Sequence, residues 1–179
     1  SERGFGVSLL NDCKYGHDVR DNVLRLTLIK SAINPDPKAD LGEHHFTYSL
    51  LPHHGDWFNA GTTMEGHKLN FPATIAELST GNNGSQAQLP ASLSFFACDS
   101  LNVVVDTMKK AEDSDEWIVR CYEYAGSRGT VGFSSHFPIV KVEEVNLMER
   151  EEQVIEHTGR GFAAYFKPYE LKTFRILLA

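Results

Sequence analysis

"WIVRCYEYAGSRGTVGFSS", residues 117–135, contains two runs rich in β-branched and aromatic residues, separated by a short turn. The runs cover residues 117–124 and 130–135, and the connection Gly-Ser-Arg-Gly begins at Gly126. Runs of this composition favour β-strands, and a short glycine-containing connection between them is typical of a hairpin. The stretch therefore predicts two adjacent antiparallel strands.

Strand-sized runs continue at hairpin intervals on both sides of this stretch. Several short strands at such spacing are typical of a small antiparallel β-sandwich. Near the end of the chain, residues 166–174 predict a strand, a tight corner and a second strand. The further predicted strands cover residues 93–97, 103–108, 140–147, 161–166 and 173–178.

The first half of the chain predicts fewer strands and one short helix. Strand-like runs lie at residues 5–9, 22–29 and 45–51, and the helix is expected near residues 56–68, capped by Asp56. In the predicted strand 22–29, Leu24 shares one face with Leu26 and Leu28 and is expected to pack in a core. A polar Gly/Asn-rich segment at residues 80–86 marks the predicted boundary between domains 1–85 and 86–179.

Composition restricts the partners and the compartment of the chain. Its 179 residues include 24 acidic and 17 basic side chains, giving a net charge of −7, and 41% are hydrophobic. Without clustered Lys and Arg, nucleic acid is not expected as a partner. No apolar run long enough to span a membrane and no signal peptide is visible, so no membrane partner is expected. Three cysteines without metal or disulfide spacing favour a reducing, cytoplasmic location.

The chain opens at Ser1 without an initiator methionine, and a strand-like run follows at once. Trimming, a cloning scar or a fragment of a longer polypeptide would each explain this opening.

Histidines and cysteines provide no complete catalytic or metal-binding set. His44 and His45 are neighbours on a predicted strand, so their side chains point to opposite faces and do not readily share a metal. Ser8 lacks the setting of a nucleophile elbow. Cys98 and Cys121 are expected to be core thiols, whereas Cys13 stays open as a reactive thiol because Lys14 and His17 are near it.

Two polar segments, residues 11–18 and residues 35–44, carry most of the ionisable side chains of the first half. Their carboxylates would permit glycoside hydrolysis, which uses two carboxyl groups across a sugar, and Tyr15 could stack on a sugar ring. Solvated loop acids are the simpler alternative. A polar loop as long as residues 11–18 buries little and costs chain entropy, so structure alone explains it poorly.

Several segments together resemble the C-terminal β region of the α-mannosidases of glycoside hydrolase family 38, in their bacterial and vacuolar or cytosolic branch. The resemblance runs in order through nearly the whole chain and ends at "PYELKTFRI". Its most specific part is the "PDPKADLGEHHFTY" run. The other segments are "GVSLLNDCKYGHDV", "NVLRLTLIKS" and "VVVDTMKKAEDSDEWIVRCYE".

The resemblance implies a mostly β fold. Residues 1–85 would be the C-terminal half of a mutarotase-like β-supersandwich, and residues 86–179 would be a small terminal antiparallel β-sandwich. The family's catalytic nucleophile, acid/base and zinc ligands lie in N-terminal domains, so no catalytic residue and no metal ligand is assigned here. Zinc is expected only in the full-length enzyme, and the isolated chain is expected to be inactive.

The resemblance also implies partners for the two polar segments. These are the N-terminal catalytic domain of the same polypeptide and an α-mannoside substrate of mannose or oligosaccharide metabolism; a homo-oligomer stays open. A free-standing carbohydrate-binding β-sandwich module is the alternative function. The residues expected to bind substrate or contact the catalytic domain are Asn11, Asp12, Lys14, Tyr15, His17, Asp36, Asp40 and Glu43.

Overall fold

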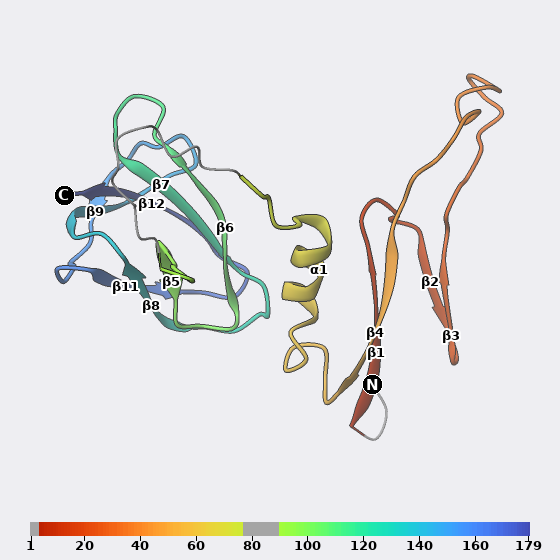
Figure 1. The fold of residues 1–179 in the computed structure, drawn as a ribbon, viewed down its shortest axis with the longest axis horizontal. Helices are drawn as coiled ribbons and strands as arrows, with labels where there is room; N and C mark the ends of the chain where they lie inside the picture. The colour runs from red at the N-terminus through yellow and green to blue at the C-terminus, as the bar shows by residue number, and fades with distance from the viewer. Residues whose placement is uncertain (1–3, 77–89) are drawn as a thin grey trace. The chain divides into compact units, whose positions relative to one another are not determined.

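The computed structural model describes residues 4–76 and 90–179. The chain divides into two compact units, Ser1–Asn82 and Asn83–Ala179, and each is considered by itself (Figure 1). The boundary predicted at residues 80–86 lies outside the described residues. The described residues contain no helix that is long and apolar enough to cross a membrane.

The second unit is an antiparallel β-sandwich, as predicted. In its described part, one sheet has five strands in the order β10-β9-β12-β7-β6, and the other has three in the order β11-β8-β5. The two-residue strand β10 was not predicted. The strands are β5 (Phe96–Cys98), β6 (Val103–Lys110), β7 (Trp117–Glu123), β8 (Gly129–Ser135), β9 (Ile139–Val145), β10 (Gln153–Val154), β11 (Gly161–Phe166) and β12 (Leu171–Leu178).

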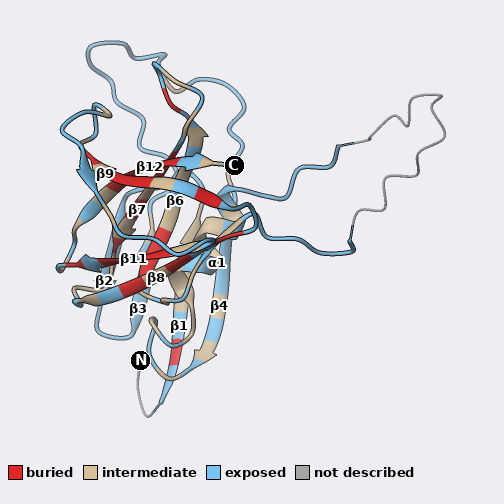
Figure 2. Ribbon diagram, turned by 90° about the vertical axis from the view of Figure 1, so that its left-hand side faces the viewer, coloured by how far each residue is buried: buried red, intermediate tan, exposed pale blue. Residues whose placement is uncertain are grey.

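Alternation along these strands builds the core between the two sheets. In β11, Phe162 and Phe166 are buried whereas the residues beside them are exposed. Phe133 from β8 lies against Phe162, with ring centroids 4.9 Å apart, and Phe174 from β12 lies 5.0 Å from Phe162. Figure 2 shows the buried segments on the strands of this unit. Burying a large side chain in this way stabilises a fold by about 1.5–3 kcal/mol.

One buried carboxylate joins two turns of the sandwich. Glu123, at the end of β7 and 2% exposed, accepts hydrogen bonds from the backbone N–H groups of Gly126 and Tyr169, each at 2.9 Å. Ala125 N, Ser127 N and Asn102 Nδ2 also donate to it, each at 3.0 Å. Burial alone would raise the pKa of Glu123, but these donors outweigh it and lower the pKa to about 2. The carboxylate therefore ties the turn after β7 to the corner between β11 and β12.

The first unit consists of two separate strand pairs. β1 (Phe5–Asn11) pairs with β4 (Tyr48–His54), and β2 (His17–Arg20) pairs with β3 (Val23–Leu26), both antiparallel. The strand predicted at residues 22–29 is shorter in the structure, where it is the four-residue β3. The strand predicted at residues 45–51 begins and ends three residues later, as β4. β2 was missed because its polar residues, read as part of a loop, lack the apolar composition of a strand.

The described residues contain one α-helix, α1 (Thr62–Asn70), which begins later than predicted. Gly61 precedes it in a left-handed conformation, with φ +66°, which interrupts a helix and which glycine adopts without steric cost. Asp56 does not cap this helix. Its Oδ1 instead accepts a hydrogen bond from Asn59 N at 2.8 Å in the turn before Gly61.

Large apolar side chains of the first unit remain exposed. Leu24, expected in a core, is 42% exposed, and Val7, Ile29 and Leu50 are exposed as well. A two-stranded sheet has no second layer to cover its faces, so it buries little apolar surface by itself. The expected core packing of Leu24 is therefore not seen among residues 4–76 and 90–179.

Candidate functional site

The polar segment 11–18 begins where β1 ends and extends into β2. Asn11 Oδ1 accepts a hydrogen bond from Lys14 N at 2.6 Å, which closes a tight turn. Asp12 N donates to Thr47 O at 3.2 Å, and Thr47 N donates to Asp12 Oδ2 at 2.8 Å. Asp12 therefore extends the β1–β4 ladder by one step, with its side chain as the acceptor.

This contact sets the charge state of two neighbouring groups. The hydrogen bond from Thr47 N favours the ionised carboxylate and lowers the pKa of Asp12. The same carboxylate, hydrogen-bonded to the thiol of Cys13, raises the pKa of that thiol. A raised pKa disfavours the thiolate, so the structure does not support Cys13 as a reactive thiol.

In the sandwich, burial raises the pKa of Cys121 to about 12, as suits a core thiol.

Lys14 and Tyr15 present the segment's charge and its aromatic ring. Lys14 Nζ lies 4.6 Å from the centroid of the Phe46 ring, a cation–π contact worth about 0.5–1 kcal/mol at an exposed site. Tyr15 is 91% exposed, so both its ring and its hydroxyl are open to a partner. The two side chains thus provide a donor and a stacking face on the same turn.

His17 closes the segment at the start of β2. Its Nδ1 lies 3.0 Å from Tyr15 O, and its Nε2 lies 3.4 Å from Asn11 Nδ2. A neutral imidazole protonated at Nδ1 satisfies both contacts, since it donates to the carbonyl and accepts from the amide. On the other side of the turn, Thr27 N donates to Gly16 O at 2.8 Å. Asn11, Asp12, Lys14 and His17 therefore belong to one hydrogen-bonded turn.

The acids of the second polar segment, residues 35–44, have hydrogen-bond and ion-pair partners near them in the sequence. Asp36 Oδ1 accepts a hydrogen bond from Lys38 N at 2.8 Å, and Asp40 Oδ2 accepts one from Ala32 N at 3.3 Å. Glu43 pairs with His45 at 3.3 Å, and both side chains are exposed. Figure 1 shows the connection between β3 and β4 as a long excursion. Within the described residues, these hydrogen bonds and this ion pair stay inside residues 32–45 and do not join the acids to residues 11–18.

Sequence reasoning missed three residues that hold the first segment in place. Phe46 and Thr47 were read only as part of a strand, although they contact Lys14 and Asp12. Asn70, at the end of α1, donates through Nδ2 to Asn11 O at 3.1 Å. The "FTY" letters of the resembling run were the available signal for Phe46 and Thr47. No local pattern pointed to Asn70.

A serine and a histidine meet on the β1–β4 pair. Ser8 Oγ lies 3.1 Å from His53 Nε2 and 2.9 Å from Thr62 Oγ1. His53, in β4, is thus half-buried and hydrogen-bonded. A nucleophile–base pair also needs a group that orients the base, yet within the described ranges His53 Nδ1 is buried without a hydrogen-bond partner. The contact lacks the third member of a triad.

The described residues do not fit a zinc site. Nowhere in residues 4–76 and 90–179 do three His, Cys, Asp or Glu side chains group closely enough to hold a metal ion. His44 is engaged elsewhere, since its Nε2 lies 2.9 Å from Asp40 O. A catalytic zinc needs about three converging protein ligands.

The arrangement can bind and position a partner, but Asp12 does not have the properties of a glycosidase's general acid. A general acid in such an enzyme needs a raised pKa, whereas that of Asp12 is lowered. The turn of residues 11–17 instead offers an ammonium group, a phenol and a fixed carboxylate on one rigid surface. Such groups suit hydrogen bonding to hydroxyls or to a facing protein surface.

Two domain families match the chain. Residues 102–174 match the glycosyl hydrolases family 38 C-terminal beta sandwich domain, and residues 1–38 match the glycosyl hydrolases family 38 C-terminal domain. The first match falls on the sandwich from the start of β6 into β12. The second includes the whole of the polar segment 11–18.

Proteins named alpha-mannosidases align with nearly the whole of this chain. The chain is 35% identical over 188 residues to alpha-mannosidase G of Dictyostelium discoideum, with 99% of this chain and 16% of that protein aligned. It is 35% identical over 184 residues to alpha-mannosidase 2C1 of Homo sapiens, covering 99% of this chain and 17% of that protein. An alpha-mannosidase of Saccharomyces cerevisiae is 27% identical over 206 residues, covering 98% and 18%. The chain thus spans about a sixth of the length of these relatives. It belongs to glycosyl hydrolase family 38, as a C-terminal β region of that family.

Proposed function

We propose that this chain is the C-terminal supporting part of an enzyme that hydrolyses terminal α-D-mannosides. The observation that carries the proposal is the alignment of 99% of the chain with proteins named alpha-mannosidases, of which it covers 16–17%. The catalytic domain would then lie in the remainder of the polypeptide. The zinc expected for the family would be held there too, because the described residues offer no ligand set for it.

In this proposal the turn of residues 11–17 faces the catalytic domain and forms part of the rim of the sugar pocket. The ordered hydrogen bonds between Asn11, Asp12 and Thr47 support it, because a rim must hold its shape in the absence of substrate. Tyr15 and Lys14 would contact a sugar ring or hydroxyl. Asp36, Asp40 and Glu43 would contribute to the contact with the catalytic domain.

The compartment belongs to the same proposal. Cys13, Cys98 and Cys121, all within the described residues, are unpaired. Free thiols are typical of a reducing compartment, and we propose a cytoplasmic enzyme on this ground.

The test compares two purified proteins on an aryl α-mannoside, each with and without added zinc. The longer polypeptide that carries this chain should release product, and the 179-residue chain should not, because we place the nucleophile and the general acid in the catalytic domain. Zinc-stimulated turnover by the short chain, surviving removal of contaminating enzyme, would contradict the proposal. So would an inactive long polypeptide, and mannoside binding by the short chain would then favour the carbohydrate-binding module.

A further inference from the structure

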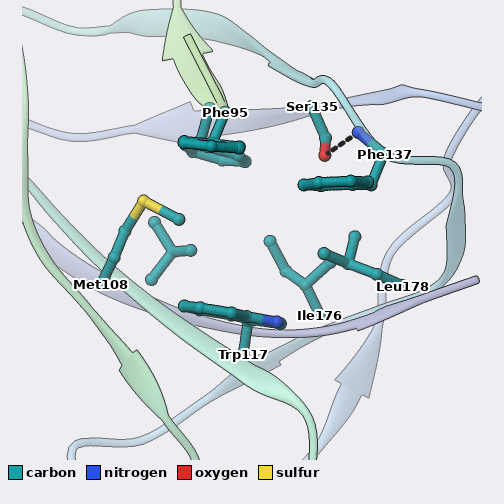
Figure 3. A pocket seen from close by; sticks show the side chains of 9 residues that line it. Phe95, Met108, Trp117, Ser135, Phe137, Ile176 and Leu178 are labelled. Carbon is teal, nitrogen blue, oxygen red and sulfur yellow. Dashed lines mark hydrogen bonds between the residues drawn. The ribbon is translucent and has the colours of Figure 1, made fainter. Parts of the chain in front are cut away.

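The sandwich unit is open at one edge, where the space between its two sheets forms an apolar cavity of about 320 Å³. Figure 3 shows Phe95 and Phe137 on one side of the cavity and Met108, Trp117 and Ile176 on the other. Phe95 and Phe137 lie parallel, with ring centroids 5.8 Å apart and planes 10° apart. The residues that line the cavity all belong to the second unit.

The chemistry of the wall selects an apolar occupant. Apart from the indole nitrogen of Trp117, the polar side-chain group among the described lining residues is the Ser135 hydroxyl. That hydroxyl already accepts a hydrogen bond from Phe137 N at 3.1 Å. A sugar carries several hydroxyls, and the described wall offers them the Ser135 hydroxyl and the Trp117 indole N–H, so most of them would lose their hydration without gaining a hydrogen-bond partner. Aliphatic or aromatic side chains fit this wall, and a mannoside does not.

The residues at the mouth of the cavity are unusually exposed for their type. Trp117 and Met108 are each 44% exposed, and Phe95 and Phe137 are exposed as well. Contiguous apolar surface of this kind is typical of interaction sites in soluble proteins. An aromatic residue that stays half-exposed beside an apolar hollow is also the usual anchor of a protein contact.

We propose that this cavity receives apolar side chains from the part of the polypeptide that lies outside residues 1–179. The proposal rests on the proposed function, because it requires a longer α-mannosidase chain. The match covers only 16% and 17% of two relatives, so more than four fifths of such a protein lies outside it and is available to fill the cavity. The sandwich thus docks on the rest of the enzyme through an apolar anchor.

The test measures the accessibility of one position in the cavity and of one position away from it. Met108→Cys places a thiol on the cavity wall, and Met148→Cys places one in the exposed loop after β9, outside the cavity. Each variant is made in the 179-residue chain and in the longer polypeptide. Maleimide labelling is then followed by mass spectrometry of the peptide that contains the new cysteine.

The 108 thiol should react at least about tenfold more slowly in the longer polypeptide than in the short chain, while the 148 thiol should change less than about twofold. Fast labelling at 108 in both proteins would overturn the proposal, because the cavity would then be open in the enzyme. Slow labelling at 108 in both would overturn it too, because the occupant would then come from residues 1–179 or from a second copy. Dilution of the short chain separates these last two sources.

A second variant guards against a misfolded cysteine mutant. Met108→Lys introduces a charge that can reach solvent in the short chain but must be buried when the cavity is filled. The melting temperature of the longer polypeptide should fall by several degrees, and that of the short chain should fall by less than about 2 °C. Equal falls in the two proteins would contradict docking. Mannosidase activity of the unmodified long polypeptide is measured in parallel, so failure of the proposed function is recognised separately.

Discussion

Glu123 shows how one side chain can determine the local geometry of two turns. Its carboxylate accepts five hydrogen bonds, four of them from the backbone, so replacing it by glutamine turns an amide NH₂ toward N–H donors. Each buried donor left unpaired costs about 1–3 kcal/mol. We expect Glu123→Gln to lower the free energy of unfolding of the sandwich by at least about 2 kcal/mol, measured by urea unfolding at pH 7. Glu156→Gln, at an exposed position, is the control and should change it little.

The same carboxylate predicts a pH dependence with a definite sign. The pKa of Glu123 is about 2 in the folded chain and about 4.5 ordinarily, so the folded state holds the ionised form more strongly. Its contribution is complete above about pH 4.5 and is lost as the pH falls toward 2. The stability difference between wild type and Glu123→Gln should therefore shrink over this window. A difference that stays constant from pH 7 to pH 2.5 would contradict the role of the charged carboxylate.

Lys14 and Tyr15 give a residue-scale test of the polar turn. In the longer polypeptide, Lys14→Ala and Tyr15→Phe should each lower kcat/KM on an aryl α-mannoside by roughly tenfold to a hundredfold, the loss of one charge-assisted hydrogen bond. The melting temperature should move little, because both side chains are exposed. Tyr48→Phe, an exposed tyrosine of β4 outside the turn, is the matched control. Wild-type kinetics in both variants would mean that the turn is only a solvated connection.

At this scale the sequence predicts residue types better than their partners. The abundance of polar groups in residues 11–18 is visible in the printed letters, but the partner of Asp12 is Thr47, 35 positions away. Only the pairing of β1 with β4 brings the two together. Nor does composition show that Glu123 is buried, since nothing in "RCYEYAG" marks its donors.

The strands of the sandwich that have a buried face were predicted close to their observed bounds, whereas β2, which has none, was missed. β8 and β11 alternate between more and less buried residues along most of their length, and β6 and β7 do so after a pair of consecutive buried residues, so their sequences carry the strand period. β2 is exposed along its whole length, so nothing in its sequence had to be apolar. The start of α1 depends on the backbone of Gly61, and a left-handed residue leaves no periodic signal.

This difference predicts how side-chain truncation acts in each unit. Leu24→Ala in β3 should lower the free energy of unfolding of the 179-residue chain by less than about 1 kcal/mol, because Leu24 is 42% exposed. Ile176→Ala in β12, 2% exposed, should cost about 2–5 kcal/mol through the lost packing and the cavity left behind. Both are measured by denaturant unfolding. A Leu24→Ala cost as large as that of Ile176→Ala would show that Leu24 packs against a surface of this chain.

On the scale of the whole molecule, the two units differ in how much of their apolar surface they cover themselves. The sandwich has a core of its own, with Phe166 and Phe174 fully buried. The first unit leaves Val7, Leu24 and Leu50 exposed. Its assignment to a β-supersandwich rests on the resemblance, and it stays a prediction.

The last prediction follows from that difference. Amide protection depends on how completely a strand is covered and paired, so β7 and β12 should exchange hydrogen slowly in the 179-residue chain, close to the rate of global unfolding. The β2–β3 hairpin, exposed except at Leu26, should exchange faster by at least about a hundredfold. Hydrogen–deuterium exchange with peptide-level mass spectrometry measures both. In the longer polypeptide the exchange of the hairpin should slow by a larger factor than that of β7 and β12, because the exposed hairpin strands gain a covering layer whereas β7 and β12 are already paired and largely buried. A hairpin already as protected as β12 in the short chain would show that the first unit is complete by itself, and one that stays unprotected in the longer polypeptide would show that the enzyme does not cover it.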